Sequence, residues 1–573
     1  MSADFDVCVI GSGAGGGPVA LALAQAGYRV VVLEKGPWLS EKDFSKDEVG
    51  ECRRAKWTPK EHEEPRVVES LATDGATWVA EATPGTTWDL WNATAVGGAT
   101  NLMSGFFLRM KPEDFRLRST YGPVAGADVT DWPIGYDDLE PWYDLVEREV
   151  GVSGRVIAHP RQERRSHPDF PYPPTKEHPF ARRIDQAGRG MGLHPVPLPR
   201  AILSRPKEGR EACSYSGFCG SYGCATGAKG SSRAALLGRA VATGRCEVRP
   251  LRCARSLQTD ARGRVTGVTF HDPLGRVERL DAKVFVVACQ AIETARLLLL
   301  STGPRHPRGI GNARDLVGRY LLSSPAGVGW GTFPYAKVEE SSLEAMKDRG
   351  AFVNRTFQDW QDYRDPATGR LIKGGNVDFL LMHPNPILTA MIQANQIGEG
   401  SRAPQWGPAL QKRLRAWFKD GKHLKFETFC DWQPMADARV TLDPTVRDQF
   451  GIPVARVRFG EHPSHREITA FLSARAREIF AALGVEDVVA FDDGGPSTNL
   501  VAGGARFGRD PATSVLDPDC RVHDADNLYV TDGSFMPTGG SVPYTWTTYA
   551  NAFRVADRIV ARLGGPRGAA PPR

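Results

Sequence analysis

The 573-residue sequence lacks several features that would point to a membrane protein or a nucleic-acid-binding protein. No apolar run approaches the roughly 18 residues that a membrane-spanning helix needs. There is no dense stripe of Lys and Arg with interleaved aromatic residues, and a net charge of +5 is small for this length. The N-terminus, Met-Ser-Ala-Asp-Phe-Asp, has no basic region of the kind that opens a signal peptide. The sequence therefore predicts a cytoplasmic protein that is not integral to a membrane and has no nucleic-acid partner.

The composition is that of a large globular protein. Hydrophobic residues make up 41% and charged residues 24%, which is ordinary for folded domains. The length is roughly three to four times that of a common domain, so a single small module is excluded. The 61 Gly and 42 Pro residues predict many tight turns. Only residues 566–573, which have no periodic apolar pattern, are predicted to form a disordered tail.

The first 34 residues follow the pattern of a dinucleotide-binding strand–helix–strand unit. Residues 6–10 form a short apolar run, and a glycine-rich turn, a helical stretch and a second apolar run follow at once. In such a unit the glycines permit the tight turn, let the backbone approach a pyrophosphate, and let helix and strand pack closely. The pyrophosphate would lie at the helix N-terminus, and the acidic residue would accept hydrogen bonds from a ribose. The predicted cofactor-binding residues of this unit are Gly11, Gly13, Gly15, Gly16 and Glu34.

A second signal lies near the C-terminus. Residues 527–533 form a short apolar strand that ends in Asp532-Gly533, and a helical stretch covers residues 549–562. A terminal strand that returns to the N-terminal sheet would bring this Asp-Gly turn beside the ribityl chain and phosphate of a flavin. Together with the position of the glycine-rich turn so early in a long chain, this favours FAD over NAD.

Four segments together resemble the glucose–methanol–choline (GMC) family of FAD-dependent oxidoreductases. They are residues 11–34, 95–109, 282–298 and 514–554, spread over nearly the whole chain in the order that the family shows. The resemblance implies an α/β fold (α+β overall), with a Rossmann-type FAD-binding domain and a discontinuous substrate domain built on a large antiparallel sheet. It also implies that the flavin is contacted by five further residues, Gly97, Gly98, Asn101, Asp532 and Gly533.

The resemblance also sets expected domain boundaries. The FAD-binding domain comprises residues 1–45, 90–115, 205–325 and 500–565, and the substrate or cap domain comprises residues 46–89, 116–204 and 326–499. The alternating stretch 426–459 is assigned to the substrate part. Some relatives anchor FAD through a His shortly after the paired glycines. Residues 99–105 contain no His, so noncovalent FAD is expected.

The sequence departs from the family at both expected proton-handling positions. The frame that normally begins with the catalytic His begins here with Leu500, and Pro543 occupies the position of the second His or Asn. Neither side chain can take a proton, although an alcohol needs base assistance to give up a hydride. Tyr544 and Asn499 adjoin these positions and are the catalytic candidates, with His462 and His465 as groups that could reach in from the substrate domain. The alternatives are a reaction that needs less base help, such as desaturation, and loss of the chemistry.

Three cysteines lie within twelve residues on a glycine-rich loop, at Cys213, Cys219 and Cys224. Their spacing resembles that of membrane-associated sugar dehydrogenases of the family, in which three thiolates hold an iron–sulfur cluster, but the second gap is one residue longer. The same loop occurs in family members without a cluster. Plain thiols or a disulfide therefore remain an alternative, and zinc is a third although a fourth ligand is missing.

Two functional classes follow. In the first, the protein is an FAD dehydrogenase that passes a hydride from a sugar-like or other alcohol substrate to the flavin and electrons on to a partner subunit or cytochrome. In the second, it is a flavin-dependent desaturase or oxidase that uses dioxygen and needs no protein partner.

Overall fold

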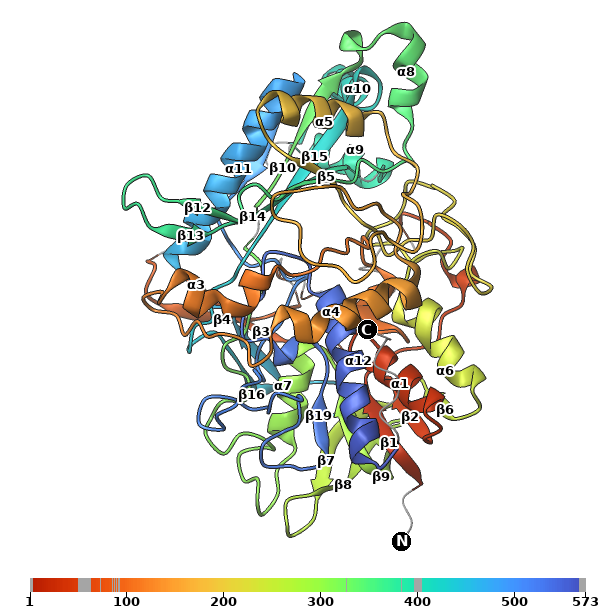
Figure 1. The fold of residues 1–573 in the computed structure, drawn as a ribbon, viewed down its shortest axis with the longest axis vertical. Helices are drawn as coiled ribbons and strands as arrows, with labels where there is room; N and C mark the ends of the chain where they lie inside the picture. The colour runs from red at the N-terminus through yellow and green to blue at the C-terminus, as the bar shows by residue number, and fades with distance from the viewer. Residues whose placement is uncertain are drawn as a thin grey trace.

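The computed structural model describes residues 4–49, 63–72, 74–84, 86, 88, 90, 93–325, 327–382, 384–395 and 404–565. The expected tail, residues 566–573, lies outside the described residues. Figure 1 shows two sheet-based parts arranged along the long axis of the molecule. One contains the first and the last of the described residues, and helices cover one face of the other.

The first part is built on a seven-stranded sheet. Its parallel strands are β6 (Cys246–Arg249), β2 (Val30–Leu33), β1 (Phe5–Ile10), β9 (Val277–Val287) and β19 (Leu528–Val530). Antiparallel strands β8 (Val265–His271) and β7 (Cys253–Thr259) extend the first half of β9. β1, β2 and β19 are fully buried or nearly so, which is why they read as continuous apolar runs. The predicted Rossmann-type domain, with its C-terminal strand returning to the N-terminal sheet, is confirmed.

Glycine is required where β1 turns into α1 (Gly16–Gln25). Gly11 has a φ of 97°, and a Cβ there would lie 2.2 Å from the Ala288 carbonyl oxygen. A Cβ on Gly16 would lie 2.0 Å from the Gly11 carbonyl oxygen, so only glycine lets the helix pack this close to the turn. The tight turn and the close packing of helix and strand, which are two of the three roles predicted for these glycines, are therefore present.

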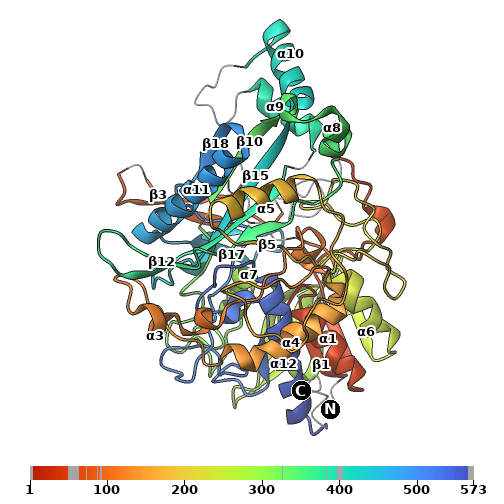
Figure 2. The ribbon, with the colours of Figure 1, turned by 45° about the horizontal axis from the view of Figure 1, so that its top comes forward.

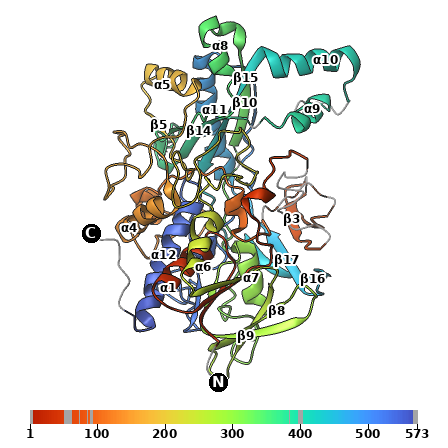
Figure 3. The same ribbon diagram turned by 90° about the vertical axis from the view of Figure 1, so that its right-hand side faces the viewer.

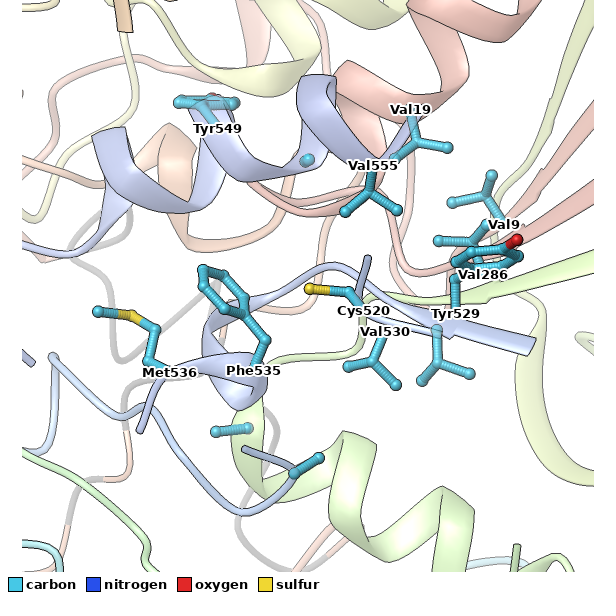
Figure 4. Packing of buried hydrophobic residues seen from close by; sticks show 14 of the residues in the cluster. Val9, Val19, Val286, Cys520, Tyr529, Val530, Phe535, Met536, Tyr549 and Val555 are labelled. Carbon is cyan, nitrogen blue, oxygen red and sulfur yellow. The ribbon is translucent and has the colours of Figure 1, made fainter. Parts of the chain in front are cut away.

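Helices cover the seven-stranded sheet. α12 (Thr545–Arg562) packs against α1 and against α4 (Tyr136–Val146). Figure 4 shows Val19 of α1 and Val555 of α12 side by side, close to Val9 and Val286 of the sheet. α7 (Ala291–Leu300) begins just beyond the end of β9 and packs against β7. The two ends of the chain are thus joined in one apolar core.

The second part is a six-stranded, fully antiparallel sheet, as expected for the substrate domain. Its order is β18 (Glu486–Phe491), β10 (Gly327–Pro334), β15 (Gly421–Cys430), β14 (Gly375–Leu381), β11 (Arg355–Phe357) and β5 (Pro195–Pro197). α11 (Pro463–Leu483) packs on β10, β14 and β15 and contacts α5 (Phe180–Gly190), as Figure 2 shows. The face of β15 opposite α11 is therefore left for the first part of the molecule.

A smaller four-stranded sheet joins β16 (Arg439–Arg447), β17 (Pro453–Arg458), β3 (Val67–Leu71) and β4 (Trp78–Ala82). It packs against α7, beside the first part of the molecule (Figure 3). Of the stretch 426–459, only the segment in β15 belongs to the large sheet. The domain boundaries expected from the sequence stay a prediction.

The remaining elements are shorter. They are α3 (Leu117–Tyr121), α6 (Gly238–Ala242), α8 (Glu340–Lys347), β12 (Asp362–Arg364), β13 (Leu371–Lys373), α9 (Pro386–Ala394) and α10 (Gly407–Arg415). Within the described ranges, none of the helices combines the length and the apolar character needed to cross a membrane.

Candidate active site

A cavity of about 540 Å³ lies where the two parts of the molecule meet. Its floor is formed by the β1–α1 turn and by residues that follow the carboxyl ends of β2, β9 and β19. Its roof includes Lys425, Glu427 and Phe429, which are alternate residues of β15. The crevice beyond the carboxyl ends of parallel strands is where open α/β sheets bind their ligands.

Most of the predicted cofactor-binding residues line this cavity. Those that do so are Gly11, Gly13, Gly15, Glu34, Gly98, Asp532 and Gly533. The other three, Gly16, Gly97 and Asn101, are absent from its lining and shape the chain nearby. The Asn101 side-chain amide donates to the carbonyl oxygens of Val96 (2.9 Å) and Gly98 (3.0 Å), which fixes the turn that Gly97 makes at a φ of 94°.

The N-terminus of α1 is suited to an anion. It has no side-chain cap and no acidic residue in its first turn, so no carboxylate of the helix itself would compete with a bound anion. A Cβ on Gly13 would meet nothing closer than 4.0 Å, whereas a Cβ on Gly15 would lie 2.6 Å from the Asp532 backbone nitrogen. Gly15 is therefore needed by the fold itself. Gly13 leaves open space, as a cofactor cradle requires.

Glu34 follows β2 and is hydrogen-bonded to Ser12 of the glycine-rich turn. Its carboxylate accepts hydrogen bonds from the Ser12 hydroxyl (2.6 Å), the Ser12 backbone N–H (3.1 Å) and the Gly36 N–H (2.9 Å). Burial nevertheless raises the pKa of Glu34 above its ordinary value. Two carboxylate oxygens offer about four lone pairs, so one acceptor position remains for a ribose hydroxyl.

Asp532 joins the C-terminal strand to α7. Its carboxylate accepts from the Gln290 backbone N–H (3.0 Å), the Ser534 N–H (2.8 Å) and the hydroxyls of Thr294 and Ser534. Burial raises the pKa of this carboxyl in spite of these bonds. With its side chain bonded to the protein, Asp532 fixes the backbone of the Asp532-Gly533 turn against the cavity.

Both catalytic candidates and the two residues predicted to replace the family's proton-handling groups line the same cavity. Leu500, Pro543, Asn499 and Tyr544 all line it. The Tyr544 hydroxyl donates to the Ser323 carbonyl oxygen, and burial raises the pKa of this phenol well above its ordinary value. Among the described residues that line the cavity, there is no histidine.

His462 and His465 are engaged elsewhere, at the start of α11. The His465 ring stacks on Trp432 at 3.8 Å, accepts from the Gln433 N–H (2.9 Å), and has a pKa that burial lowers to about 3. His462 Nε2 lies 2.8 Å from the Ala125 carbonyl oxygen. Neither residue lines the cavity, so the expectation that one of them reaches the reacting atoms is not supported.

Sequence reasoning missed the residues of β15. Lys425 Nζ lies 2.5 Å from Glu427 Oε1, and each side chain is about one quarter exposed, at 26% and 27%. The alternation of β15 is visible in the sequence and puts these two residues and Phe429 on one face. Their assignment to the cavity needed the three-dimensional structure, because the sequence does not say which face of the sheet is covered by α11.

Asp378 stands directly opposite Glu427 on β14. It is fully buried, and the hydroxyl of Thr356, which stands opposite it on β11, only partly offsets the cost of burying its charge. Burial raises its pKa to about 7, and the nearby Glu427 acts in the same direction. At neutral pH this carboxyl therefore carries only part of a negative charge.

The three-cysteine loop surrounds a second, smaller cavity of about 70 Å³. Cys213, Cys219 and Cys224 all line it and are free thiols. A tetrahedral zinc ion would hold thiolate sulfurs about 3.8 Å apart. The three sulfurs do not all lie within 4.8 Å of one another, which disfavours a single shared ion.

Three buried cations surround this loop. The Lys229 ammonium donates to the carbonyl oxygens of Tyr222 (2.8 Å), Cys219 (3.0 Å) and Asn101 (3.1 Å), which connects the loop to the turn at residues 97–101. Burial lowers the pKa of the Arg200 and Arg210 guanidiniums to about 10. In the described part of the chain, none of the three cations forms an ion pair with a carboxylate. A buried positive charge of this kind favours an anionic partner. Burial alone would raise the pKa of Cys224, but Lys229 lowers it below its ordinary value.

Comparisons with known proteins agree with this site. Residues 175–325 and 434–552 match the two family models described as GMC oxidoreductase, and residues 6–44 match an FAD binding domain. The chain is 33% identical to a 2-methyl-1,2-propanediol dehydrogenase of Mycolicibacterium austroafricanum, over 97% of this chain and 95% of that protein. It is 32% identical to a paromamine 6'-oxidase of Streptomyces fradiae, over 98% and 92%. It is 28% identical to a fructose dehydrogenase large subunit of Gluconobacter japonicus, over 97% and 98%.

A solved structure has the same fold. A variant of the formate oxidase of Aspergillus oryzae superposes with a TM-score of 0.61 at 17% identity, covering 98% of this chain and all of that one. The family resemblance read from the four sequence segments is confirmed by the full-length relatives and the two family models. The chain belongs to the GMC oxidoreductase family and is an FAD-dependent oxidoreductase.

Proposed function

We propose that the protein is a dehydrogenase that oxidises a hydroxyl of a sugar-like or other alcohol substrate to a carbonyl, with noncovalent FAD in the large cavity. The observation that carries this proposal is the single cavity that joins the glycine-rich turn, the Asp532-Gly533 turn and the two family base positions beneath a polar sheet face. FAD held by these residues would supply the acceptor for the hydride that leaves the substrate carbon as the carbonyl forms. The named relatives include dehydrogenases and oxidases, which supports the reaction class.

The residues present fit FAD. Gly13 and the uncapped start of α1 would receive the pyrophosphate, and Glu34 has one acceptor position left for the adenosine ribose. Gly98 and Gly533 present backbone without side chains to the same cavity. No His occurs at residues 99–105 to form a covalent anchor. Acid precipitation should therefore release yellow cofactor into the supernatant, whereas flavin retained on the pellet would contradict noncovalent binding.

The hydroxyl proton needs a route that does not involve the usual imidazole. Tyr544 stays protonated at neutral pH because burial raises its pKa, so we assign it and Asn499 the role of orienting the substrate hydroxyl. The proton then leaves to solvent in the cavity. Loss of a positioned base typically costs about 10²- to 10⁴-fold in rate, so simple alcohols should react slowly.

The experiment is anaerobic mixing of the holoenzyme with a panel of alcohols, followed by readmission of dioxygen. Flavin reduction by an alcohol supports the proposed function. Slow reoxidation by dioxygen, with fast reoxidation by an artificial acceptor, identifies a dehydrogenase. Rapid reoxidation by dioxygen identifies the alternative, an oxidase that needs no protein partner.

We propose a second role for the three-cysteine loop, as the site of an iron–sulfur cluster that serves an electron-accepting subunit or cytochrome. Three buried cations without carboxylate partners favour an anionic group among these thiols. Cys213, Cys219 and Cys224 would hold the cluster, which supplies one-electron transfer when present. One relative is described as the large subunit of a fructose dehydrogenase, which supports a partner.

Iron and acid-labile sulfide in the purified protein test this second role. Replacement of Cys219 by Ser should remove the iron and slow transfer to artificial acceptors, while flavin reduction by substrate continues. Cys246, which lies in β6 and lines neither cavity, supplies the control substitution Cys246→Ser. Absence of iron from the native protein, with unchanged acceptor kinetics in Cys219→Ser, would leave the loop a structural role.

A further inference from the structure

The face of β15 that lines the cavity carries an ion pair that the proposed reaction does not use. Lys425 and Glu427 are two residues apart on the strand, and both side chains reach the cavity. Their contact of 2.5 Å involves only one carboxylate oxygen. The other oxygen of Glu427 forms no hydrogen bond or ion pair in the described part of the chain.

The pair offers both donors and acceptors to a ligand. An ammonium group has three N–H donors, of which Lys425 uses one on Glu427, and the free Glu427 oxygen accepts. Neighbouring hydroxyl groups, each a donor and an acceptor, complement this arrangement. A single hydroxyl, once placed at the reacting position, would leave the pair without a partner. Phe429, two residues further along the same face, offers apolar surface to the C–H groups of a ligand.

The pair carries no net charge, so it gives a charged ligand no net attraction that would offset the loss of its hydration. A substrate ammonium would be attracted by Glu427 and repelled by Lys425, and the reverse holds for a substrate carboxylate. Asp378, which stands beside Glu427 on the neighbouring strand β14, is fully buried and does not line the cavity. The cavity lining also includes the uncharged polar residues Ser104 and Asn385.

We propose that Lys425 and Glu427 form a subsite that binds the non-reacting hydroxyls of a neutral polyol, so that the substrate class is a vicinal diol or neutral sugar. The inference rests on the proposed alcohol oxidation and names its substrate class. Neither residue is assigned to the proton transfer.

The test compares flavin reduction by 1,2-propanediol, fructose, 1-propanol, glucosamine and gluconate. The native enzyme should favour the two neutral polyols over 1-propanol by at least about 10-fold in kcat/KM, because buried polar groups left unpaired penalise the analogue that lacks a hydroxyl. Glucosamine and gluconate should be poorer than fructose. Equal rates with the diol and 1-propanol, or preference for a charged compound, would overturn the inference.

Two variants assign the effect to the pair. Lys425→Met and Glu427→Gln should each raise the KM for the neutral polyols by about 10- to 100-fold, the loss expected for a hydrogen bond to a charged group. The KM for 1-propanol should rise less than the KM for the neutral polyols, because 1-propanol has no second hydroxyl for the pair. A matched control is Lys337→Met or Glu486→Gln, which breaks an exposed pair of 2.6 Å at another end of the same sheet, away from the cavity.

The outcomes separate this inference from the proposed function. If no alcohol reduces the flavin, the alcohol oxidation itself fails. If alcohols reduce it but Glu427→Gln lowers kcat for 1-propanol and 1,2-propanediol alike, Glu427 handles the proton and the polyol subsite is refuted. Unchanged KM values in both variants would refute it as well.

Discussion

Replacing Gly13 by Ala tests whether the glycine-rich turn exists for the fold or for a ligand. The added Cβ would meet no protein atom closer than 4.0 Å, so the apoprotein can accommodate it. The backbone is not in the left-handed region, so Ala introduces no conformational strain. The methyl group would, however, occupy space at the lining of the cavity, where the FAD pyrophosphate is proposed to approach the protein backbone.

The expected cost falls on FAD affinity alone. Inserting one methyl group into a close-packed contact costs about 1–3 kcal/mol. This corresponds to a rise of about 5- to 150-fold in the Kd for FAD. The assay is titration of FAD into apoprotein, with the melting temperature of the apoprotein measured in parallel. The control Gly238→Ala lies in helix α6, where the added Cβ would also meet nothing, and it should leave the Kd unchanged.

Two results would refute the reasoning. If Gly13→Ala binds FAD as tightly as the native protein, the cofactor does not approach the turn at this residue. If the variant apoprotein melts far below the native one, the turn is tighter than the structure shows. Gly16→Ala provides the contrast, because its Cβ would lie 2.0 Å from the Gly11 carbonyl oxygen and should destabilise the fold itself.

Two further substitutions address the catalytic end and the sheet above it. Tyr544→Phe should lower the rate of flavin reduction by less than about 10-fold in stopped-flow measurements, because the phenol is protonated and donates to the Ser323 carbonyl oxygen. A larger drop with unchanged FAD content would show that Tyr544 carries the proton. Burial raises the pKa of Asp378 to about 7, so the folded state binds a proton at this carboxyl more tightly than the unfolded state does. The protonated carboxyl contributes its full stabilisation below about pH 4, and this contribution is lost as the pH rises through about 7. Asp378→Asn should therefore raise the melting temperature at about pH 8 more than at about pH 5, and a pH-independent difference between the two proteins would contradict the shifted carboxyl.

Much of the flavin half was predictable because its signals are local. Gly11 and Gly16 carry steric requirements that are visible as spacing, and buried parallel strands read as apolar runs. The Asp532-Gly533 turn was placed correctly because a terminal strand that returns to a parallel sheet ends at the same edge as β1. The departure from the family at Leu500 and Pro543 stays a prediction, although both residues line the cavity.

The substrate half was less predictable because its contacts are remote in sequence. Alternation in β15 shows two faces but does not say which face meets the cavity, so Lys425 and Glu427 were overlooked. His462 and His465 were candidates by residue type alone, and tertiary packing places them at the start of α11. The cations around the cysteine loop come from separate segments of the chain, so no sequence motif predicts that they lie together.

The most direct test of the central claim is anaerobic mixing of the FAD-loaded protein with a neutral polyol such as fructose. The absorption of oxidised flavin is expected to bleach, with formation of one carbonyl product per flavin reduced. If the flavin stays fully oxidised with every alcohol and polyol tested, although FAD is bound and the protein is folded, the account is contradicted.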